Sequence, residues 1–528
     1  MLLKATIANS LWTASNLAAY WSFRRALREP GAAQRGKLRG LLTQNAGTAF
    51  GKAHAFDKIS SYEEFTRRVP LTEYTALEPW VERVRHGEIN VLTRERVTHL
   101  IPTSGSSGAR KLIPFTAGLQ REFNAAIGPW LVDLARRSPG ILGGPAYWSV
   151  TPALGDQSVE KSAVPIGFDT DAAYLGGSRR KLADAVMAVP ANVGWAQSIE
   201  TFRYETLLHL LRCPELRLIS VWHPSFLTLL LDALPRLWKN LINDIACGSA
   251  AMRPLRQRAD ELRGTDPSQP ETLWPNLCVI SCWGDAAASL ALQNLRGRFP
   301  RTLIQPKGLI ATEAFVTIPF ADHHPLAIRS HFYEFIDSGG RMFPAEGLHE
   351  GEQYEIVVTT AGGLWRYRLG DQVIVTGFVE KTPSLKFLGR TEEVSDQFGE
   401  KLSESFVNEA LREVFECEVP RFALVAPDEQ DGHCGYTLYV EGVAHPYWAK
   451  SLDQILRRNP HYAYCRDLGQ LAPLRLFIVS ANAFETFARR QTTNGSRLGD
   501  IKPKALSRSS DWSTIFSGEY IDYGPIYE

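Results

Sequence analysis

The chain has 528 residues, of which 44% are hydrophobic and 22% are charged, and its formal net charge is +1. This is the composition of a globular protein of roughly two to four domains. The near-neutral charge excludes the basic surface typical of nucleic-acid-binding proteins and the acidic tail typical of a disordered segment.

The N-terminal segment, residues 1–21, is predicted to form an amphipathic helix docked on the body of the protein. Asn9, Ser10 and Thr13 interrupt the apolar run that a signal peptide requires. No stretch reaches the about 20 apolar residues that span a membrane. The seven cysteines are scattered and none forms a CxxC pair, which favours core positions in a reducing compartment. We therefore expect a cytoplasmic protein without a membrane span.

Helical spacing of apolar residues dominates residues 1–92, and after them short apolar strands alternate with helices. The expected strands cover 98–101, 146–151, 216–222, 277–283 and 302–306. The expected helices cover 116–137, 204–212, 224–234 and 286–298. This alternation predicts an α/β fold with mixed sheets and crossover helices.

The pattern changes twice toward the C-terminus. Residues 354–379 read as close strands with turns at 361–363 and 370–371, which predicts an antiparallel meander or a small β-barrel-like region. The last part of the chain mixes expected helices at 404–415, 448–458 and 483–490 with expected strands at 422–426, 436–440 and 474–479. We predict an N-terminal domain over 1–389 and a small α+β C-terminal lid domain over 390–528, with a ligand cleft between them.

The stretch from Thr103 to Lys111 combines two glycines, four hydroxyl side chains and two cations within nine residues. Glycines let backbone N–H groups turn inward to bind an anion, and hydroxyls and a cation add further donors and charge. The predicted phosphate contacts are Ser104, Gly105, Ser106, Ser107 and Gly108, with Lys111 nearby. The spacing differs from a Walker A loop, and the same composition also suits an ordinary surface loop.

Three later stretches stand out beside this loop. Ala-Thr-Glu at 311–313 follows the expected strand at 302–306. Residues 365–371 read Trp-Arg-Tyr-Arg-Leu-Gly-Asp, and residues 387–390 read Phe-Leu-Gly-Arg. These three stretches and the loop at 103–111 need a common explanation.

In order and spacing, these four stretches resemble the motifs of the acyl-adenylate-forming superfamily, which includes acyl-CoA ligases and firefly luciferase. Within it the chain is more similar to the auxin-responsive Gretchen Hagen family of acyl-acid amido synthetases. That closer resemblance rests on Lys-Leu-Ile-Pro at 111–114, Phe-Tyr-Glu-Phe-Ile at 332–336 and Tyr-Arg-Leu-Gly-Asp-Gln-Val-Ile-Val-Thr-Gly-Phe at 367–378. It covers nearly the whole chain and implies a large adenylate-forming domain followed by a small lid.

The resemblance implies a nucleotide site for ATP and Mg²⁺. It makes Glu313 the Mg²⁺ ligand and Thr312 a phosphate contact, which suits the preference of Mg²⁺ for one or two carboxylates plus phosphate oxygens. Asp371 is expected to accept both ribose hydroxyls, since a carboxylate has two acceptor oxygens. Tyr367 is expected in the same nucleotide site, and Arg390 is expected to contact ribose or phosphate at the hinge.

The catalytic residues implied are Lys111, Thr312 and a lysine of the C-terminal lid. The stretch 497–504 resembles the family's lid motif, which selects Lys502, with Lys504 as the second candidate. A lid lysine that neutralises the α-phosphate stabilises the charge that builds up when pyrophosphate leaves.

One position departs from the superfamily pattern, because Leu309 and Ile310 occupy the places of an adenine-stacking Tyr and a Gly. An aliphatic side chain covers a purine less well than an aromatic ring does. A non-catalytic nucleotide or acyl-acid binding protein therefore stays open as an alternative, as does an acyl-CoA ligase that forms a thioester. Side chains expected near the acyl group are Trp148, Phe168, Trp222, His223, Phe226 and Trp283.

The reaction implied is adenylation of a small carboxylic acid, followed by transfer of the acyl group to the amine of an amino acid. The expected partners are these two substrates, with no nucleic acid, and the expected state is a monomer or a weak homo-oligomer. The identity of the acid and of the amino acid does not follow from the residues.

Overall fold

The computed structural model describes residues 2–103, 111–149, 162–167, 182, 184–196, 198–249, 252–285, 288–390, 394–395, 397–398, 400–416, 418–430, 433–493 and 504–521. The chain separates into two compact units. The first unit contains Met1–Trp222, Phe226–Trp283 and Phe299–Phe387, and the second contains His223–Ser225, Gly284–Arg298 and Leu388–Glu528. The domain boundary predicted after residue 389 lies close to the last change of unit and stays a prediction.

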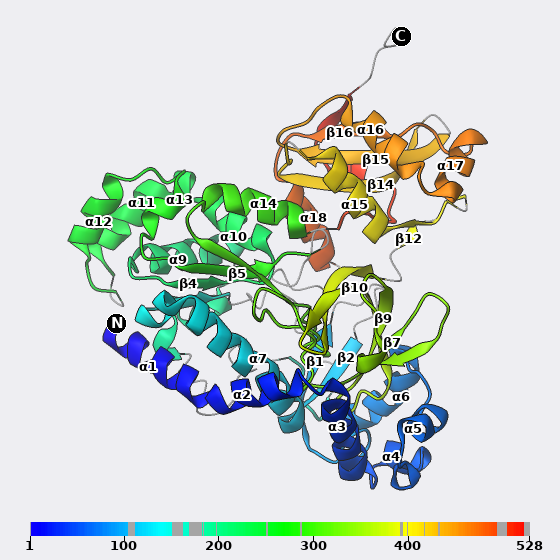
Figure 1. Cartoon of the computed structure of the whole chain (residues 1–528). Coiled ribbons are helices and arrows are strands. Elements are labelled where there is room, and N and C mark those ends of the chain that lie inside the picture. Colours follow the sequence, from blue (N-terminus) through cyan, green and yellow to red (C-terminus); the bar gives the residue numbers. More distant parts are fainter. Residues whose placement is uncertain are drawn as a thin grey trace. The chain divides into compact units, whose positions relative to one another are not determined.

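Helices dominate the beginning of the first unit, as the apolar spacing predicted (Figure 1). They are α1 (Leu2–Ser15), α2 (Leu17–Ala26), α3 (Pro30–Asn45), α4 (Ala49–Ala53), α5 (Tyr62–Arg68), α6 (Tyr74–Arg85) and α7 (Ala117–Arg137). Helix α1 buries Ala5, Ala8 and Trp12 along one stripe, and α1 and α2 both pack against α7. The predicted docking of the N-terminal helix is therefore confirmed.

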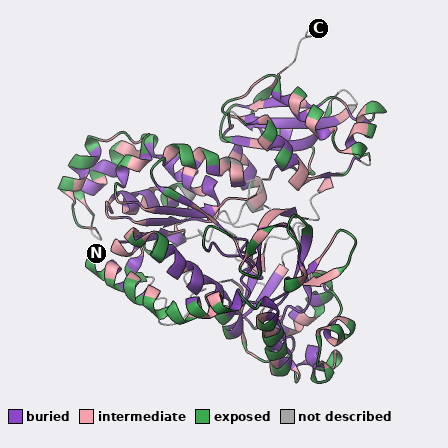
Figure 2. Ribbon diagram, viewed as in Figure 1, coloured by how far each residue is buried: buried purple, intermediate pink, exposed green. Residues whose placement is uncertain are grey.

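A parallel four-stranded sheet forms the centre of the α/β part of the first unit. Its strands, in spatial order, are β3 (Ala146–Trp148), β4 (Leu218–Ser220), β5 (Val279–Trp283) and β6 (Leu303–Lys307). Its strands β4 and β5 are buried almost throughout (Figure 2). Residues of α1 and α7 pack on the sheet in one apolar cluster with Leu218 and Val279. The helices along the same part of the chain are α9 (Ile199–Leu211), α10 (Pro224–Asp232), α11 (Leu234–Cys247), α12 (Arg256–Arg263) and α13 (Pro270–Leu273).

Two further sheets complete the first unit. Strands β1 (Val97–Thr103) and β2 (Lys111–Thr116) pair antiparallel. A five-stranded sheet has the order β11-β10-β9-β7-β8, built from β7 (Phe332–Ile336), β8 (Met342–Pro344), β9 (Gln353–Thr359), β10 (Tyr367–Val379) and β11 (Thr382–Arg390). The predicted meander is confirmed, and β11 runs on into the second unit.

The turn predicted at residues 370–371 is wrong, because β10 runs without a break from Tyr367 to Val379. Gly370 has φ of 74°, and the register against β9 shifts between Arg368 and Gln372. The glycine therefore forms a bulge, which bends the strand and does not end it. A bulge and a turn both favour glycine, so the sequence alone did not separate them.

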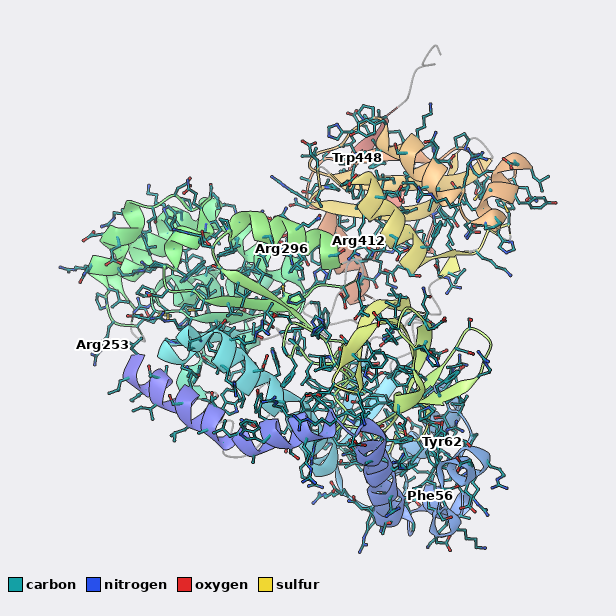
Figure 3. All side chains as sticks on the ribbon, viewed as in Figure 1. Phe56, Tyr62, Arg253, Arg296, Arg412 and Trp448 are labelled. Atoms are coloured by element: carbon teal, nitrogen blue, oxygen red, sulfur yellow. The ribbon has the colours of Figure 1, made fainter. Side chains whose placement is uncertain are left out.

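The second unit has its own four-stranded sheet, β14 (Phe422–Gln430), β15 (His433–Glu441), β16 (Arg475–Val479) and β17 (Gly518–Ile521). Its helices are α14 (Ala288–Arg298), α15 (Glu404–Val414), α16 (Trp448–Leu456), α17 (Pro460–Asp467), α18 (Ala483–Thr493) and α19 (Trp512–Ile515). A two-stranded sheet joins β12 (Val394–Ser395) and β13 (Leu402–Ser403). Arg412 of α15 donates from Nε to Ser289 Oγ of α14 at 2.9 Å (Figure 3). The mixed helix and strand content confirms the predicted α+β module.

Candidate functional site

Thr312 and Glu313 lie at the tip of a short hairpin that covers residues 309–317. Ile310 and Phe315 form an antiparallel bridge, and the N–H of Ala311 donates to Ala314 O at 2.9 Å. Thr312 and Glu313 are therefore the two residues between the arms. Thr312 is half-buried, and Glu313 is only 7% exposed. The buried position of Glu313 distinguishes it from a solvated loop acid.

The base of this hairpin is tightly closed at Gly308. A Cβ atom at Gly308 would lie 2.3 Å from the backbone O of Thr317, closer than any real contact. The N–H of Leu309 donates to Thr317 Oγ1 at 2.8 Å, and Leu309 itself is buried in the main apolar core. Leu309, at the position of the superfamily's adenine-stacking Tyr, thus packs into the core of the first unit.

Two side chains hold the returning arm of the hairpin at Phe315. The N–H of Phe315 donates to Nε2 of His331 at 3.1 Å, and Tyr333 Oη donates to Phe315 O at 2.5 Å. His331 Nδ1 contacts Glu122 Oε2 at 2.9 Å. Both His331 and Glu122 are buried, so these contacts are shielded from water. No pattern in the sequence around His331 indicated this role, because its partners Glu122 and Phe315 are not its neighbours in the chain.

The predicted phosphate loop joins β1 to β2. Thr103 pairs with Lys111, so the two strands end opposite each other where the loop leaves and returns. Lys111 is half-buried, and the next N–H, of Leu112, donates to Tyr74 Oη at 2.8 Å. The expected phosphate contacts Ser104, Gly105, Ser106, Ser107 and Gly108 lie outside the described residues.

The expected ribose motif lies on β10. Asp371 directly follows the bulge at Gly370 and is 3% exposed. Tyr367 is buried and pairs with Val358 of β9. Arg368 contacts Glu355 through two nitrogens, at 2.7 and 2.8 Å, which gives this arginine a structural ion pair.

One apolar core joins the elements that carry these motifs. Leu112 of β2, Leu309 and Ile310 of the hairpin, and Tyr367 of β10 belong to the same cluster of buried side chains. The phosphate-loop strands, the Thr312–Glu313 hairpin and β10 are therefore parts of a single packed body, although long stretches of sequence separate them.

The remaining predicted positions lie toward the C-terminus. Arg390 is half-buried at the end of β11, and Lys502 lies outside the described residues. Lys504, the second candidate, is half-buried. The segment after Lys504 is fixed to the second unit, because Val425 N donates to Ala505 O at 2.8 Å and Ala505 N donates to Glu404 Oε1 at 3.2 Å.

A buried lysine that the sequence reading did not single out ends strand β6. Lys307 is 6% exposed, donates from Nζ to Val221 O at 2.8 Å and lies 4.8 Å from the ring centroid of Trp222. Burial lowers the pKa of Lys307 to about 7, because a charged amine is poorly solvated there. The neighbouring Trp283 packs on Trp222 with ring centroids 5.7 Å apart.

The other side chains expected near the acyl group separate into different environments. Trp148 stacks on Trp12 of α1 at 5.7 Å, and Phe226 packs on Phe202 of α9 at 6.1 Å. Phe168 lies outside the described residues. Trp222 and Trp283 remain together at the carboxyl ends of β4 and β5, the edge where open α/β sheets bind ligands.

The donor set fits a magnesium ion held jointly with a nucleotide. Within the described ranges, no group of three His, Cys, Asp or Glu side chains is arranged to hold a metal. Mg²⁺ is commonly bound by one or two carboxylates with substrate phosphates and water, so a single buried Glu313 beside Thr312 is sufficient.

Comparison with known proteins identifies the family. The GH3 family N-terminal domain matches residues 19–304, the central domain matches 324–390 and the C-terminal domain matches 402–511. A probable indole-3-acetic acid-amido synthetase, GH3.12, of Oryza sativa subsp. japonica is 24% identical over 92% of this chain and 93% of its own. The jasmonoyl–L-amino acid synthetase JAR6 of Nicotiana attenuata is 24% identical over 70% of each chain.

Solved structures share the fold. The AtGH3.15 acyl acid amido synthetase, solved in complex with 2,4-DB, superposes with a TM-score of 0.84 at 17% identity, over 98% of this chain and 99% of that one. A 2-hydroxyisobutyryl-CoA ligase gives a TM-score of 0.52 at 13% identity, over 91% and 89% of the two chains.

These matches define an amide-forming ligase with the adenylate-forming fold. The chain belongs to the GH3 family, which confirms the resemblance seen in its motifs. Among the described residues, no helix is both long and apolar enough to cross a membrane.

Proposed function

We propose that the chain uses ATP and Mg²⁺ to convert a small carboxylic acid into an acyl-AMP and then transfers the acyl group to the amine of an amino acid. The observation that carries this proposal is the buried Glu313 at the tip of a braced hairpin, within the core that also holds β2 and β10. The cytoplasm is the proposed compartment and a monomer or weak homo-oligomer the proposed state.

The first half-reaction places demands that the named residues can meet. A carboxylate oxygen of the acid attacks the α-phosphorus of ATP, the bond to the bridging oxygen breaks, and pyrophosphate leaves. Glu313 would hold the metal, and Thr312 would contact a phosphate oxygen. Lys111 and residues 104–108 would bind the outgoing phosphates. When bound, Mg²⁺ neutralises charge on the phosphate oxygens. Lys502 supplies a further cation at the α-phosphate.

The second half-reaction forms the amide. The neutral amine of the amino acid attacks the acyl carbon, the bond to AMP breaks, and the amine proton is released. Asp371 and Arg390 keep the AMP part in place through ribose and phosphate. A reorientation of the lid between the two steps would let one site serve both.

Acceptor competition tests this proposal. The enzyme, ATP, Mg²⁺ and a panel of aryl, indole and fatty acids are incubated with a mixture of amino acids and coenzyme A, and products are identified by mass spectrometry. We expect acid- and ATP-dependent N-acyl amino acids, lost in Glu313→Gln and retained in Glu352→Gln, a change at an exposed acid. Thioesters without amides would replace the proposal with the acyl-CoA ligase alternative.

A further inference from the structure

A buried acid lies on the apolar face of helix α7. Glu122 is 3% exposed and falls between the buried Leu119 and Phe123. Its Oε1 contacts Lys37 Nζ at 3.2 Å, and its Oε2 accepts from the N–H of Ala361 at 2.9 Å. A carboxylate is kept in such a place only if its acceptor capacity is used.

The third partner of Glu122 is His331, and the hydrogen bonds around this ring define its tautomer. Because the N–H of Phe315 donates to Nε2, that nitrogen carries a lone pair. The proton of the neutral ring is therefore on Nδ1, which donates to Glu122 Oε2 at 2.9 Å. Glu122 thus fixes the tautomer that allows His331 to accept from the hairpin backbone.

We propose that Glu122 and His331 are positioning residues that hold the hairpin 309–317 and thereby set the place of Glu313 against the metal–nucleotide complex. Phe315 is two residues after Glu313 and directly opposite Ile310 in the hairpin. Without its contact to His331, Phe315 still has the hydrogen bond from Tyr333 Oη to its backbone O, but its N–H loses its side-chain acceptor. The inference rests on the proposed function, because the role of Glu313 belongs to it.

The strength of this effect follows from how metal sites respond to their supporting layer. Changing a residue that orients a metal ligand commonly lowers metal affinity or activity about 10- to 100-fold. His331→Leu removes the acceptor for Phe315 N–H and the donor for Glu122, so we expect its loss of metal affinity to fall in this range. His331→Gln retains an amide oxygen as an acceptor and is expected to restore most of the loss.

The test uses Mn²⁺ as the probe, titrated by electron paramagnetic resonance in the presence of a non-hydrolysable ATP analogue. We expect His331→Leu and Glu122→Ala to raise the dissociation constant for Mn²⁺ about tenfold. Glu122→Gln can keep an oxygen toward His331 and Ala361 and is expected to recover most of the affinity. Glu352→Gln is the control, since it changes an exposed acid outside the hairpin.

Tyr333→Phe is a milder second variant that keeps the ring but removes the hydroxyl bonded to Phe315 O. It gives a result even if His331→Leu does not fold, and a loss of about threefold or more in Mn²⁺ affinity is expected from one hydrogen bond. A lower melting temperature with unchanged Mn²⁺ affinity in both variants would show a structural role only and overturn the inference.

Glu313→Gln separates this inference from the proposed function. If Glu313→Gln binds Mn²⁺ as well as the wild type does, the metal role of Glu313 is wrong and the positioning role is overturned with it. If Glu313→Gln loses Mn²⁺ but the His331, Glu122 and Tyr333 variants do not, the proposed function stands and only the positioning role fails.

Discussion

The side chain of His331 joins Glu122 of helix α7, at 2.9 Å, to the backbone of the hairpin that presents Glu313. The two residues are 209 positions apart in the sequence. Their contact ties a helix of the N-terminal half to a turn that carries a motif of the adenylate-forming fold, inside a core closed to water.

Lys307 should make stability depend on pH. Its pKa falls from 10.5 to about 7 on burial, so between these values the unfolded chain binds more protons than the folded chain. Stability therefore rises with pH across this window, by about 1.4 kcal/mol for each unit of pKa difference. Lys307→Met removes the buried amine and should be more stable than the wild type at pH 7. Urea denaturation of both proteins at pH 7, 8 and 9 gives the free energy of unfolding at each pH. If this free energy changed with pH equally in the wild type and in Lys307→Met, the prediction would be contradicted.

Asp371 should accept hydrogen bonds from the ribose hydroxyls of ATP. Replacing the carboxylate in Asp371→Asn weakens a charged hydrogen bond worth about 1.5–3 kcal/mol, so KM for ATP should rise roughly 10- to 100-fold. The same variant should lose most of the wild-type preference for ATP over 2′-deoxy-ATP. Steady-state exchange kinetics with both nucleotides measure this preference. If Asp371→Asn kept the full wild-type preference for ATP over 2′-deoxy-ATP, Asp371 would not be the residue that binds the ribose.

Lys502 should serve only the first half-reaction. Lys502→Ala is expected to abolish acyl-AMP formation because the cation at the α-phosphate is missing, yet to form amide from supplied acyl-AMP at close to the wild-type rate. Pyrophosphate release and amide production are followed separately. Lys450→Ala, at an exposed lysine of α16, is the control. Equal loss of both half-reactions in Lys502→Ala would contradict this role.

Gly308 should tolerate no side chain. The Cβ of Gly308→Ala would meet the backbone O of Thr317 at 2.3 Å, and neither backbone segment can move freely. Overpacking of this kind costs about 1–3 kcal/mol. Gly40→Ala is the control, because Gly40 is exposed in helix α3 with nothing within 4 Å of its Cβ position. Gly40→Ala should stabilise the protein by about 0.5–1 kcal/mol. Thermal melting of the two variants measures both changes in stability. A Gly308→Ala variant as stable as the wild type would contradict the close approach of Gly308 to Thr317.

Local pattern in the sequence was enough to predict the parallel strands and the helix over Ala117–Arg137, because apolar runs and helical spacing are local properties. The hairpin that isolates Thr312 and Glu313 could not be predicted in this way, since its bonds are to the distant His331 and Tyr333. An acid within the apolar stripe of α7, at Glu122, was the one local signal of that network. Gly370 suits both a turn and a β-bulge, and the turn predicted from the sequence was wrong.

Adenylation is tested most directly by acid-dependent exchange of pyrophosphate into ATP, measured with Mg²⁺ and without any acceptor over a panel of aryl, indole and fatty acids. We expect exchange with one class of acid, and loss of this exchange in Glu313→Gln. Measurable ATP binding without exchange for any acid would contradict adenylation and favour a protein that binds its ligands without turnover.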